Sequence, residues 1–488
     1  MEDTVGLRSI IRQKRFENPF DIVMKLIPFY GMDRPQAISP TSKIHYICGN
    51  GIIVIDPQTE AGPVVLSHHD AGYRLVKKQG VDCCDVGSNA PLFCEKLVED
   101  TQDAAKYREN LARVFIYSLY TVYQANTRIM LASIAYMLAS LNADLWRCAI
   151  DFFPIFHGIG YDTFPGDPRA GADYGKSDIM KIVCAIFGIY LPTDKHQGQL
   201  PGSSSLAATT DIACGLRNVS HIMDDEDTKA YSAPAVKMFA NGTDRKVFNT
   251  TGQDHRANTS FSAYIHGVLT NSYPKCQDPS DSKAVFSRLF MVGFKPFKNR
   301  MPVVQDSTMD NLHSLMKSLR PQLSAFLPYL VCCNDANVDL EGLYIMKALV
   351  TNALSEHVVS NVQRRISSMA MIALNMIYVW DFLGRNPVIL TDIFMYICKD
   401  AVERVIRDEC ITEDWCRLLA TFPKHASEPA RSIQYDATLD EYTFSYVLLR
   451  YFVFHCSMCS DSHFPPASQR RAPSLAFLAP PCPTFFPS

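Results

Sequence analysis

Residues 170–177 read AGADYGKS, and residues 178–191 continue as DIMKIVCAIFGIYL. The first eight residues match the pattern of a phosphate-binding loop, with Ala170 in place of the first glycine. In such a loop, consecutive backbone N–H groups and the N-terminus of the following helix hold an anion. Lys176 is expected to reach the β- and γ-phosphates, and Ser177 to bind Mg²⁺. The nucleotide-binding residues predicted by this pattern are Ala170, Gly171, Ala172, Asp173, Tyr174, Gly175, Lys176 and Ser177.

A loop of this kind is followed by a helix. We predict that helix over residues 178–191, because apolar residues recur at helical spacing along one face. Asp178 lies in its first turn, where a carboxylate interacts favourably with the helix dipole. The apolar face consists of Ile179, Ile182, Val183 and Ile186.

The same loop requires a buried strand before it. The sequence predicts that strand over Phe152–His157, which leaves 12 residues before Ala170 and exceeds the length of a tight turn. Gly158 and Gly160 follow the predicted strand, and we interpret them as the opening of the loop, separated by an insertion from Gly175. The alternative is that the strand lies elsewhere.

Four consecutive acidic residues follow a second predicted strand, NVSHIM at 218–223. They begin 48 positions after Lys176 and are Asp224, Asp225, Glu226 and Asp227. A nucleotide hydrolase needs an acidic pair at the end of a buried strand, to support the metal and to orient or deprotonate the attacking water. We favour Asp224 and Asp225 for this pair, with Asp224 toward the metal and Glu226 as the alternative catalytic carboxylate. A solvated acidic turn is the competing interpretation.

Two later segments continue the pattern. Residues 263–270, AYIHGVLT, predict a buried strand that leads into Asn271, a polar residue able to sense the γ-phosphate and position water. Residues 284–294, AVFSRLFMVGF, place Arg288 on a turn ahead of another apolar strand, from which a guanidinium could reach a neighbouring subunit's nucleotide. The order of these features indicates function more strongly than either feature alone.

In this order, residues from about Phe152 to Pro302 resemble the helicase (ATPase) domain of primase-helicase proteins from viruses, plasmids and mobile elements, of the superfamily-3 and related AAA+ type. The matching text runs from FFPIF to AGADYGKSDIMKIVCAIFG, then through SSSLAATTDIACGLRNVSHIMDDED, FANGTDRKVFNTTG and VLTNS to DSKAVFSRLFMVGF, about a third of the chain. The resemblance implies a hexameric, ATP-driven motor on DNA. The catalytic residues it implies, together with the alternative carboxylate, are Lys176, Asp224, Asp225, Glu226, Asn271 and Arg288.

In motors of this type, the tract between the acidic pair and the sensor carries a loop that grips the phosphate backbone. Here that tract contains Arg245-Lys246 and His255-Arg256 among glycine, threonine and asparagine residues. We expect a flexible, locally basic loop that contacts single-stranded DNA, with RNA as the alternative. A plain solvated turn is the competing interpretation.

The composition limits the remaining function classes. The chain has 488 residues, a mass of 54.8 kDa and 47% hydrophobic residues, which excludes a mostly disordered or fibrous protein. A net charge of -3 gives no overall positive field for nucleic acid, so a binding surface for it must be local. Sixteen scattered cysteines favour a reducing compartment. The charged N-terminus and the absence of a long apolar run predict an intracellular protein that does not span a membrane.

We predict an α/β P-loop NTPase core, AAA+-like, flanked by a small N-terminal β-containing module and helical domains. Residues 42–57, SKIHYICGNGIIVIDP, predict a β-hairpin around Gly49-Asn50-Gly51 in the N-terminal module. The predicted divisions are the N-terminal module at 1–96, a helical collar at 97–148, the core at 149–305, a helical domain at 306–421 and a poorly ordered tail at 422–488.

Several other functions find less support in the sequence. Cys456 and Cys459, with His455 and His463 nearby, have the spacing of half a zinc site, but no second pair matches them. A non-catalytic nucleic-acid-binding or assembly protein, derived from such a motor with a decayed site, is the main alternative, because the loop spacing is irregular. A small-molecule P-loop kinase is the third possibility, and the long helical segments disfavour it.

Overall fold

The structure is a computed structural model of the chain. It describes residues 25–27, 29–34, 43–56, 63–75, 91–94, 101–123, 126–160, 174–189, 216–223, 233–242, 245–247, 257–259, 264–269, 274, 276–278, 281–295, 314, 318–320, 322–333, 339–354, 362–401, 433–436 and 441–444. Residues 1–416 form one compact unit and residues 417–488 a second. In the second unit, β14 (Ile433–Asp436) pairs antiparallel with β15 (Glu441–Phe444), and the rest of the predicted tail lies outside the described residues.

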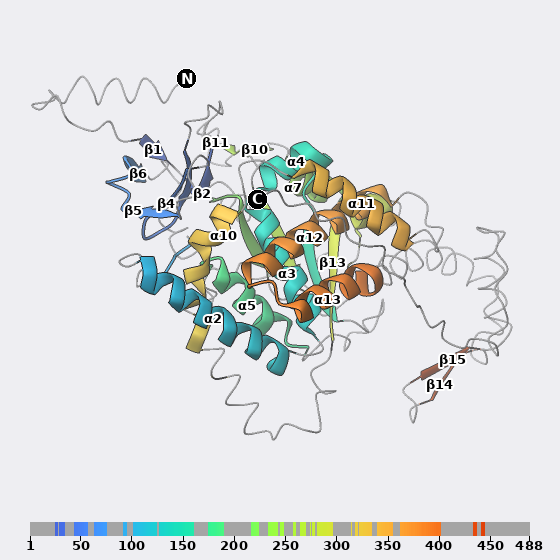
Figure 1. Cartoon of the computed structure of the whole chain (residues 1–488). Coiled ribbons are helices and arrows are strands. Elements are labelled where there is room, and N and C mark those ends of the chain that lie inside the picture. The colour runs from blue at the N-terminus through green and yellow to red at the C-terminus, as the bar shows by residue number, and fades with distance from the viewer. Residues whose placement is uncertain are drawn as a thin grey trace, which may run out of the picture. The chain divides into compact units, whose positions relative to one another are not determined.

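The first unit is built on a four-stranded parallel sheet (Figure 1). Its strands stand in the order β13-β7-β12-β9. They read as continuous apolar runs because a parallel sheet is buried on both faces. The bounds are β7 (Ile155–Gly160), β9 (Val219–Met223), β12 (Tyr264–Leu269) and β13 (Leu289–Phe294), so the strands predicted before the acidic run, before Asn271 and after Arg288 are confirmed.

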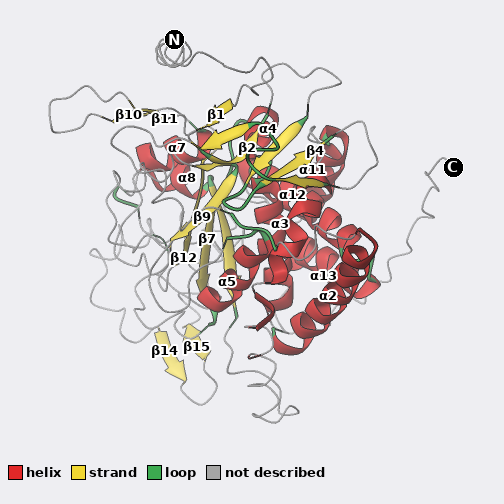
Figure 2. Cartoon of the chain, turned by 90° about the vertical axis from the view of Figure 1, so that its left-hand side faces the viewer, coloured by secondary structure: helices red, strands yellow, loops and turns green. Residues whose placement is uncertain are grey.

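Helices cover both faces of this sheet, as Figure 2 shows. Side chains alternate along each strand, so Phe156 and Phe290 join the large core under α3, α5 and α12, whereas Ile155 and Leu289 pack under α7 and α8. The helix bounds are α3 (Thr127–Ser140), α5 (Lys176–Ile186), α7 (Ala233–Asn241), α8 (Ser282–Phe286) and α12 (Gln363–Phe382). The result is a mixed α/β fold with helices on both sides of one sheet.

Helix α5 confirms the helix predicted after the phosphate loop. The four apolar residues predicted to share a face, Ile179, Ile182, Val183 and Ile186, are at most 3% exposed. The helix ends five residues before the predicted end at Leu191, because Gly188 adopts φ +73 and donates its N–H to the carbonyl oxygen of Ala185 at 3.1 Å.

The interpretation of Gly158 and Gly160 as the opening of the phosphate loop is wrong, because both lie inside β7. A Cβ atom on Gly158 would stand 2.7 Å from Cδ2 of Leu269 and 2.8 Å from Cε2 of Phe294. Glycine therefore allows side chains of two neighbouring strands to pack across the centre of β7. Strand β7 ends at Gly160, and the predicted loop begins at Ala170.

The N-terminal sheet is continuous with the central region. The predicted hairpin is confirmed: β3 (Ile44–Ile47) and β4 (Ile52–Ile55) pair antiparallel, and the N–H of Cys48 donates to the carbonyl of Gly51 at 2.8 Å. The sheet has the order β5-β4-β3-β2-β8, with β2 (Tyr30–Asp33), β5 (Val64–Leu66) and β8 (Leu216–Arg217) as its other strands. Its last strand, β8, comes from a segment predicted to belong to the core. A separate parallel pair joins β1 (Lys25–Ile27) to β6 (Tyr73–Leu75).

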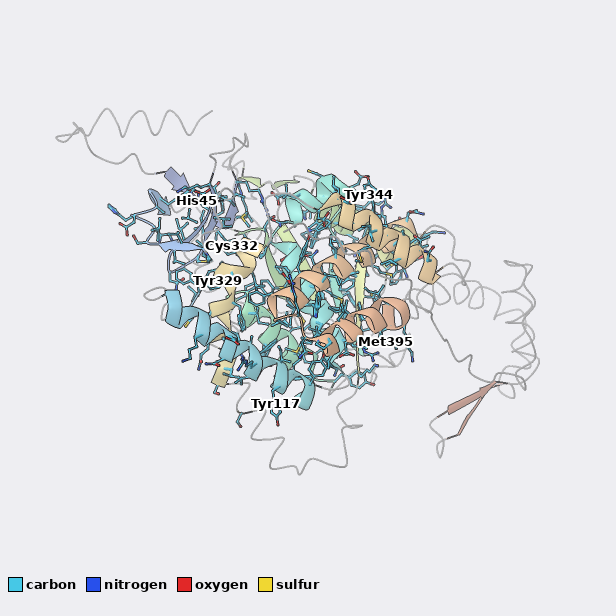
Figure 3. The ribbon with its side chains drawn as sticks, viewed as in Figure 1. His45, Tyr117, Tyr329, Cys332, Tyr344 and Met395 are labelled. Atoms are coloured by element: carbon cyan, nitrogen blue, oxygen red, sulfur yellow. The ribbon has the colours of Figure 1, made fainter. Side chains whose placement is uncertain are left out.

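A polar cluster lies within this N-terminal region, where Figure 3 labels His45. The hydroxyl of Tyr73 lies 3.0 Å from Oδ2 of the buried Asp33 and 2.7 Å from Nδ1 of His45. Burial raises the pKa of Tyr73, and the nearby charge of Asp33 raises it further. Tyr73 therefore stays protonated and links β6 to β2 and β3.

The helical segments belong to the same unit as the sheets. Helix α3 packs against α12 and α5, and one continuous hydrophobic core contains residues from Phe29 to Ala401. Arg128 pairs with Asp392 at 2.9 Å and with Asp400 at 3.4 Å. Elements on both sides of the predicted divisions at 96/97, 148/149 and 305/306 share this core, and the divisions themselves stay predictions. The remaining helices are α2 (Thr101–Val122), α4 (Ala143–Ile150), α10 (Leu327–Cys333), α11 (Leu340–Leu354) and α13 (Pro387–Met395).

Among the helices that the structure describes, none alone has both the length and the apolar composition of a membrane span, although α3 and α4, bent by 91°, meet these criteria as a pair.

Candidate functional site

The predicted phosphate loop leads into the N-terminus of α5. Gly175 adopts φ +64, a left-handed conformation that favours glycine, and no side chain caps the helix. The first backbone N–H groups of a helix have no partner within the helix. This end of α5 can therefore offer N–H groups to an anion. Residues Ala170, Gly171, Ala172 and Asp173 lie outside the described residues.

Lys176 begins α5 and is 6% exposed. Its Nζ lies 5.8 Å from the centre of the Tyr174 ring, within the range of a cation–π contact. A cation at a helix N-terminus opposes the helix dipole, whereas an anion there is stabilised. The combination of Lys176 with an uncapped N-terminus thus suits a bound anion better than an empty helix end. Ser177 is half-buried and follows Lys176 in the first turn.

The sheet brings three predicted segments to one edge. In a parallel sheet the carboxyl ends of all strands meet at the same edge. Met223 at the end of β9 pairs with Val268, and Leu269 at the end of β12 pairs with Gly158 of β7. Strand β12 lies between β7 and β9. The chain thus enters its acidic run and reaches Thr270 and Asn271 from neighbouring positions on this edge. Asp224, Asp225, Glu226 and Asn271 themselves lie outside the described residues, so their roles stay predictions.

Arg288 lies at the opposite edge. It immediately precedes β13, whose first residue, Leu289, pairs with Ile155 at the start of β7. Six residues of strand span about 20 Å, which exceeds the reach of an arginine side chain. Arg288 therefore lies a strand's length from the edge at which β7, β9 and β12 end, and its predicted role toward another subunit's nucleotide stays a prediction.

The surroundings of Arg288 were not visible in the sequence. The residue is 5% exposed; its Nη1 donates to the carbonyl of Ala284 at 2.8 Å and its Nε to Oδ1 of Asn241 at 3.4 Å. Burial lowers the pKa of Arg288, and the positive charge of Arg364 lowers it further. Both acceptors are neutral, and Asn241 lies 47 positions from Arg288 in the sequence. Access to another molecule would require the side chain to leave this buried position.

The predicted basic loop contains a short hairpin. Strand β10 (Arg245–Val247) pairs antiparallel with β11 (Ala257–Thr259), with Lys246 opposite Asn258. These six residues are paired strands where the sequence predicted a loop, because three-residue strands are too short for their alternation to predict them. His255 and Arg256 lie outside the described residues.

No group of three or more His, Cys, Asp and Glu side chains that could hold a metal occurs within the part of the chain that the structure describes. The half zinc pattern at Cys456 and Cys459 and the predicted Mg²⁺ ligand Asp224 fall outside that part.

Comparison with known proteins gives a likeness at the level of fold. The chain matches no family model and no curated protein. Among solved structures it is similar to SCCmec type IV Cch, an active helicase, with a TM-score of 0.50 and 10% sequence identity. The match covers 93% of this chain and 76% of that chain. At this identity the likeness shows the fold alone, and the chain has a fold like that of a helicase structure.

Proposed function

We propose that the chain is an ATP-hydrolysing motor of the helicase type that acts on single-stranded DNA, with RNA as the alternative nucleic acid. Its role would be replication or mobilisation of a viral or mobile genome. The observation that supports this most directly is that the carboxyl ends of β7, β9 and β12 meet at one sheet edge, and that the predicted phosphate loop follows β7 in the sequence. This is the arrangement that a superfamily-3-like AAA+ P-loop core requires for its loop, acidic pair and sensor.

The predicted residues have distinct roles in this proposal. Lys176 and the N–H groups at the start of α5 bind the triphosphate, and Ser177 with Asp224 holds Mg²⁺. Asp225, or Glu226 in its place, orients or deprotonates the attacking water, and Asn271 positions that water beside the γ-phosphate. Bound Mg²⁺ neutralises charge that develops on the phosphates.

Arg288 acts between subunits in this proposal. To reach a nucleotide held by another molecule, its side chain would leave the contacts with Asn241 and Ala284. A closed ring of identical chains, such as a hexamer, supplies that arrangement at every interface. An arginine in this role stabilises charge in the transition state of phosphoryl transfer.

The β10–β11 hairpin is the proposed nucleic-acid contact. It carries Arg245 and Lys246, and His255 and Arg256 lie in the sequence between its strands. The chain as a whole has a net charge of -3, so this local basic segment would supply the attraction to the phosphate backbone.

The test is ATP hydrolysis by the purified chain, with and without single-stranded DNA, for wild type and Lys176→Ala. We expect DNA-stimulated hydrolysis that Lys176→Ala abolishes while the circular dichroism spectrum stays unchanged. Lys181→Ala is the matched control, because it removes a positive charge from the same helix, beyond its first turn, and should hydrolyse normally. Full hydrolysis by Lys176→Ala would refute the assignment.

The alternative of a decayed motor keeps one specific observation in its favour. Fifteen residues separate the end of β7 from the start of α5, 161–175, which is long for a phosphate loop. A decayed site predicts DNA binding that is independent of nucleotide and no hydrolysis. DNA-stimulated release of phosphate would exclude it.

A further inference from the structure

The chain passes from the N-terminal sheet to the central sheet at a single residue, Asn218. Strand β8 ends at Arg217 and pairs with β2, and β9 begins at Val219. Asn218 adopts φ +53 and is 1% exposed. Asparagine is among the few residues other than glycine that tolerate this left-handed conformation. The strand that leads to the acidic run is therefore a direct continuation of a strand in the N-terminal sheet.

One carboxylate holds this crossing point from α4. Oδ1 of Asp144 accepts a hydrogen bond from Nδ2 of Asn218 at 2.7 Å, and its Oδ2 lies 3.1 Å from Nε of Arg34, just after β2. Arg34 also donates to the carbonyl of Leu141 at 3.3 Å and to the side chain of Asn142. Asp144 thus joins the residue that follows β2 to the residue that precedes β9.

Asp144 also lies near three arginines, of which Arg34 and Arg147 are partly buried and Arg217 is exposed. Burial lowers the pKa of Arg34, Arg217 and Arg147, the last to about 10, and the negative charge of Asp144 opposes this in all three. The guanidinium of Arg217 lies 3.8 Å from the centre of the Phe29 ring, next to β2. Loss of the Asp144 charge would weaken the electrostatic support of all three cations at this junction.

Helix α4 holds the chain on the far side of the acidic run as well. Arg147 donates to the carbonyls of Phe239 at 3.0 Å and Ala240 at 3.2 Å, at the C-terminal end of α7. Positive charge is favourable at that end of a helix. The acidic run lies in the sequence between β9 and α7. Helix α4 therefore contacts the chain on both sides of that run, at Asn218 before β9 and at the end of α7.

We propose that Asp144 is a positioning residue for ATP hydrolysis: through Asn218 it fixes the start of β9, and through Arg34 it makes the position of β9 depend on the N-terminal sheet. The acidic residues that follow β9 in the sequence would then depend on this junction for their placement. The inference rests on the proposed ATPase function. It adds a route by which the N-terminal sheet controls hydrolysis from outside the nucleotide site.

The test compares Asp144→Asn, Arg34→Met and Asn218→Gly with wild type. Asn218→Gly is compatible with the left-handed backbone and removes the side chain that bonds Asp144, so it serves if the other two variants fold poorly. We expect kcat for ATP hydrolysis to fall at least tenfold, with the Kd for ATP unchanged, because Lys176 and α5 are untouched. Asp56→Asn is the matched control: it removes the partner of Lys43 at 3.8 Å on the surface of the same N-terminal sheet and should leave kcat unchanged.

A second measurement does not depend on hydrolysis. Amide hydrogen exchange in the nucleotide-free protein should be faster for residues 216–223 in Asp144→Asn and Asn218→Gly, with residues 155–160 of β7 unchanged as the internal reference. Unchanged kcat in folded variants, or a parallel loss of kcat, ATP binding and β7 protection, would overturn the inference. If wild type hydrolyses ATP and the three variants hydrolyse it with the same kcat, the positioning role fails while the proposed function stands. If wild type itself shows no hydrolysis, the proposed function fails and takes the inference with it.

Discussion

Replacement of Gly158 by alanine tests whether this residue serves the sheet or the phosphate loop. Gly158 pairs with Leu269 of β12 and with Val292 of β13. The added Cβ would lie 2.7 Å from Leu269 and 2.8 Å from Phe294, well inside the usual carbon–carbon separation of about 3.5–4.0 Å. Both neighbours are at most 1% exposed, so neither has free space into which to move.

The expected loss of stability follows from two opposing effects. Overpacking of a core costs about 1–3 kcal/mol. Replacement of glycine by alanine restricts the unfolded chain and returns about 0.4–1 kcal/mol. The free energy of unfolding should therefore fall by about 1–2 kcal/mol. With a urea slope of about 3 kcal/mol/M, the unfolding midpoint should fall by about 0.5 M.

The assay is urea unfolding followed by circular dichroism, together with the Kd for ATP. The Kd should not change, because Gly158 lies inside β7 and away from Gly175. Gly384→Ala is the comparison: its φ is +86 and no atom lies within 4 Å of the added Cβ, so it measures the backbone effect without a clash. An unchanged midpoint for Gly158→Ala together with weaker ATP binding would refute the packing explanation and restore Gly158 to the loop.

Four further predictions concern stability, cysteine reactivity, pH and DNA binding. Gly31→Ala should lower the free energy of unfolding by at least about 2 kcal/mol in the same urea assay. The reason is that Gly31 has φ +99 and that an added Cβ would stand 2.0 Å from the carbonyl oxygen of Arg217. A loss below about 1 kcal/mol would contradict the β2–β8 pairing. Iodoacetamide at pH 8 should label the exposed Cys148 in the folded protein but not Cys48 or Cys184, as read by peptide mass spectrometry. Burial raises the pKa of Cys184 to about 12, whereas the pKa of a thiol in the unfolded chain is about 8.5. Unfolding therefore releases the Cys184 proton between these two pH values, and the free energy of unfolding should fall as pH rises through this window. Arg245→Ala combined with Lys246→Ala should make the slope of log binding constant against log salt concentration, for single-stranded DNA, shallower by about 0.7 for each lost phosphate contact. Lys237→Ala is the control. A slope equal to that of the control would show that the hairpin is not part of the binding surface.

Local features of the fold followed from the sequence because their causes are local. The helical spacing from Ile179 to Ile186, the turn residues at Gly49-Asn50-Gly51 and the apolar run after Arg288 each reflect backbone preferences and burial within a few residues. Each element exists where its pattern predicted it. The end of β7 was the exception, because a glycine that permits close packing has the same letter as a glycine that forms a loop.

The candidate site was predictable only in part for the same reason. The pattern around Lys176 and the strand before Asp224 could be read directly, and the sheet then placed the strand ends at one edge. The burial of Arg288 against Asn241 and Ala284 could not be read, because it depends on how α7 and α8 pack together. Its distance from the edge at which β7, β9 and β12 end likewise follows from the direction and length of β13.

Contacts between distant segments belong to the tertiary structure alone. Strand β8 has two residues and no periodicity, and it exists because Leu216 pairs with Tyr30, 186 positions away. Asp144 on a short helix becomes the partner of both Arg34 and Asn218 only once the two sheets meet. Side-chain patterns encode which face of an element is buried, whereas the partner on that face is chosen by the packing of the whole chain, since many apolar surfaces are compatible with the same pattern.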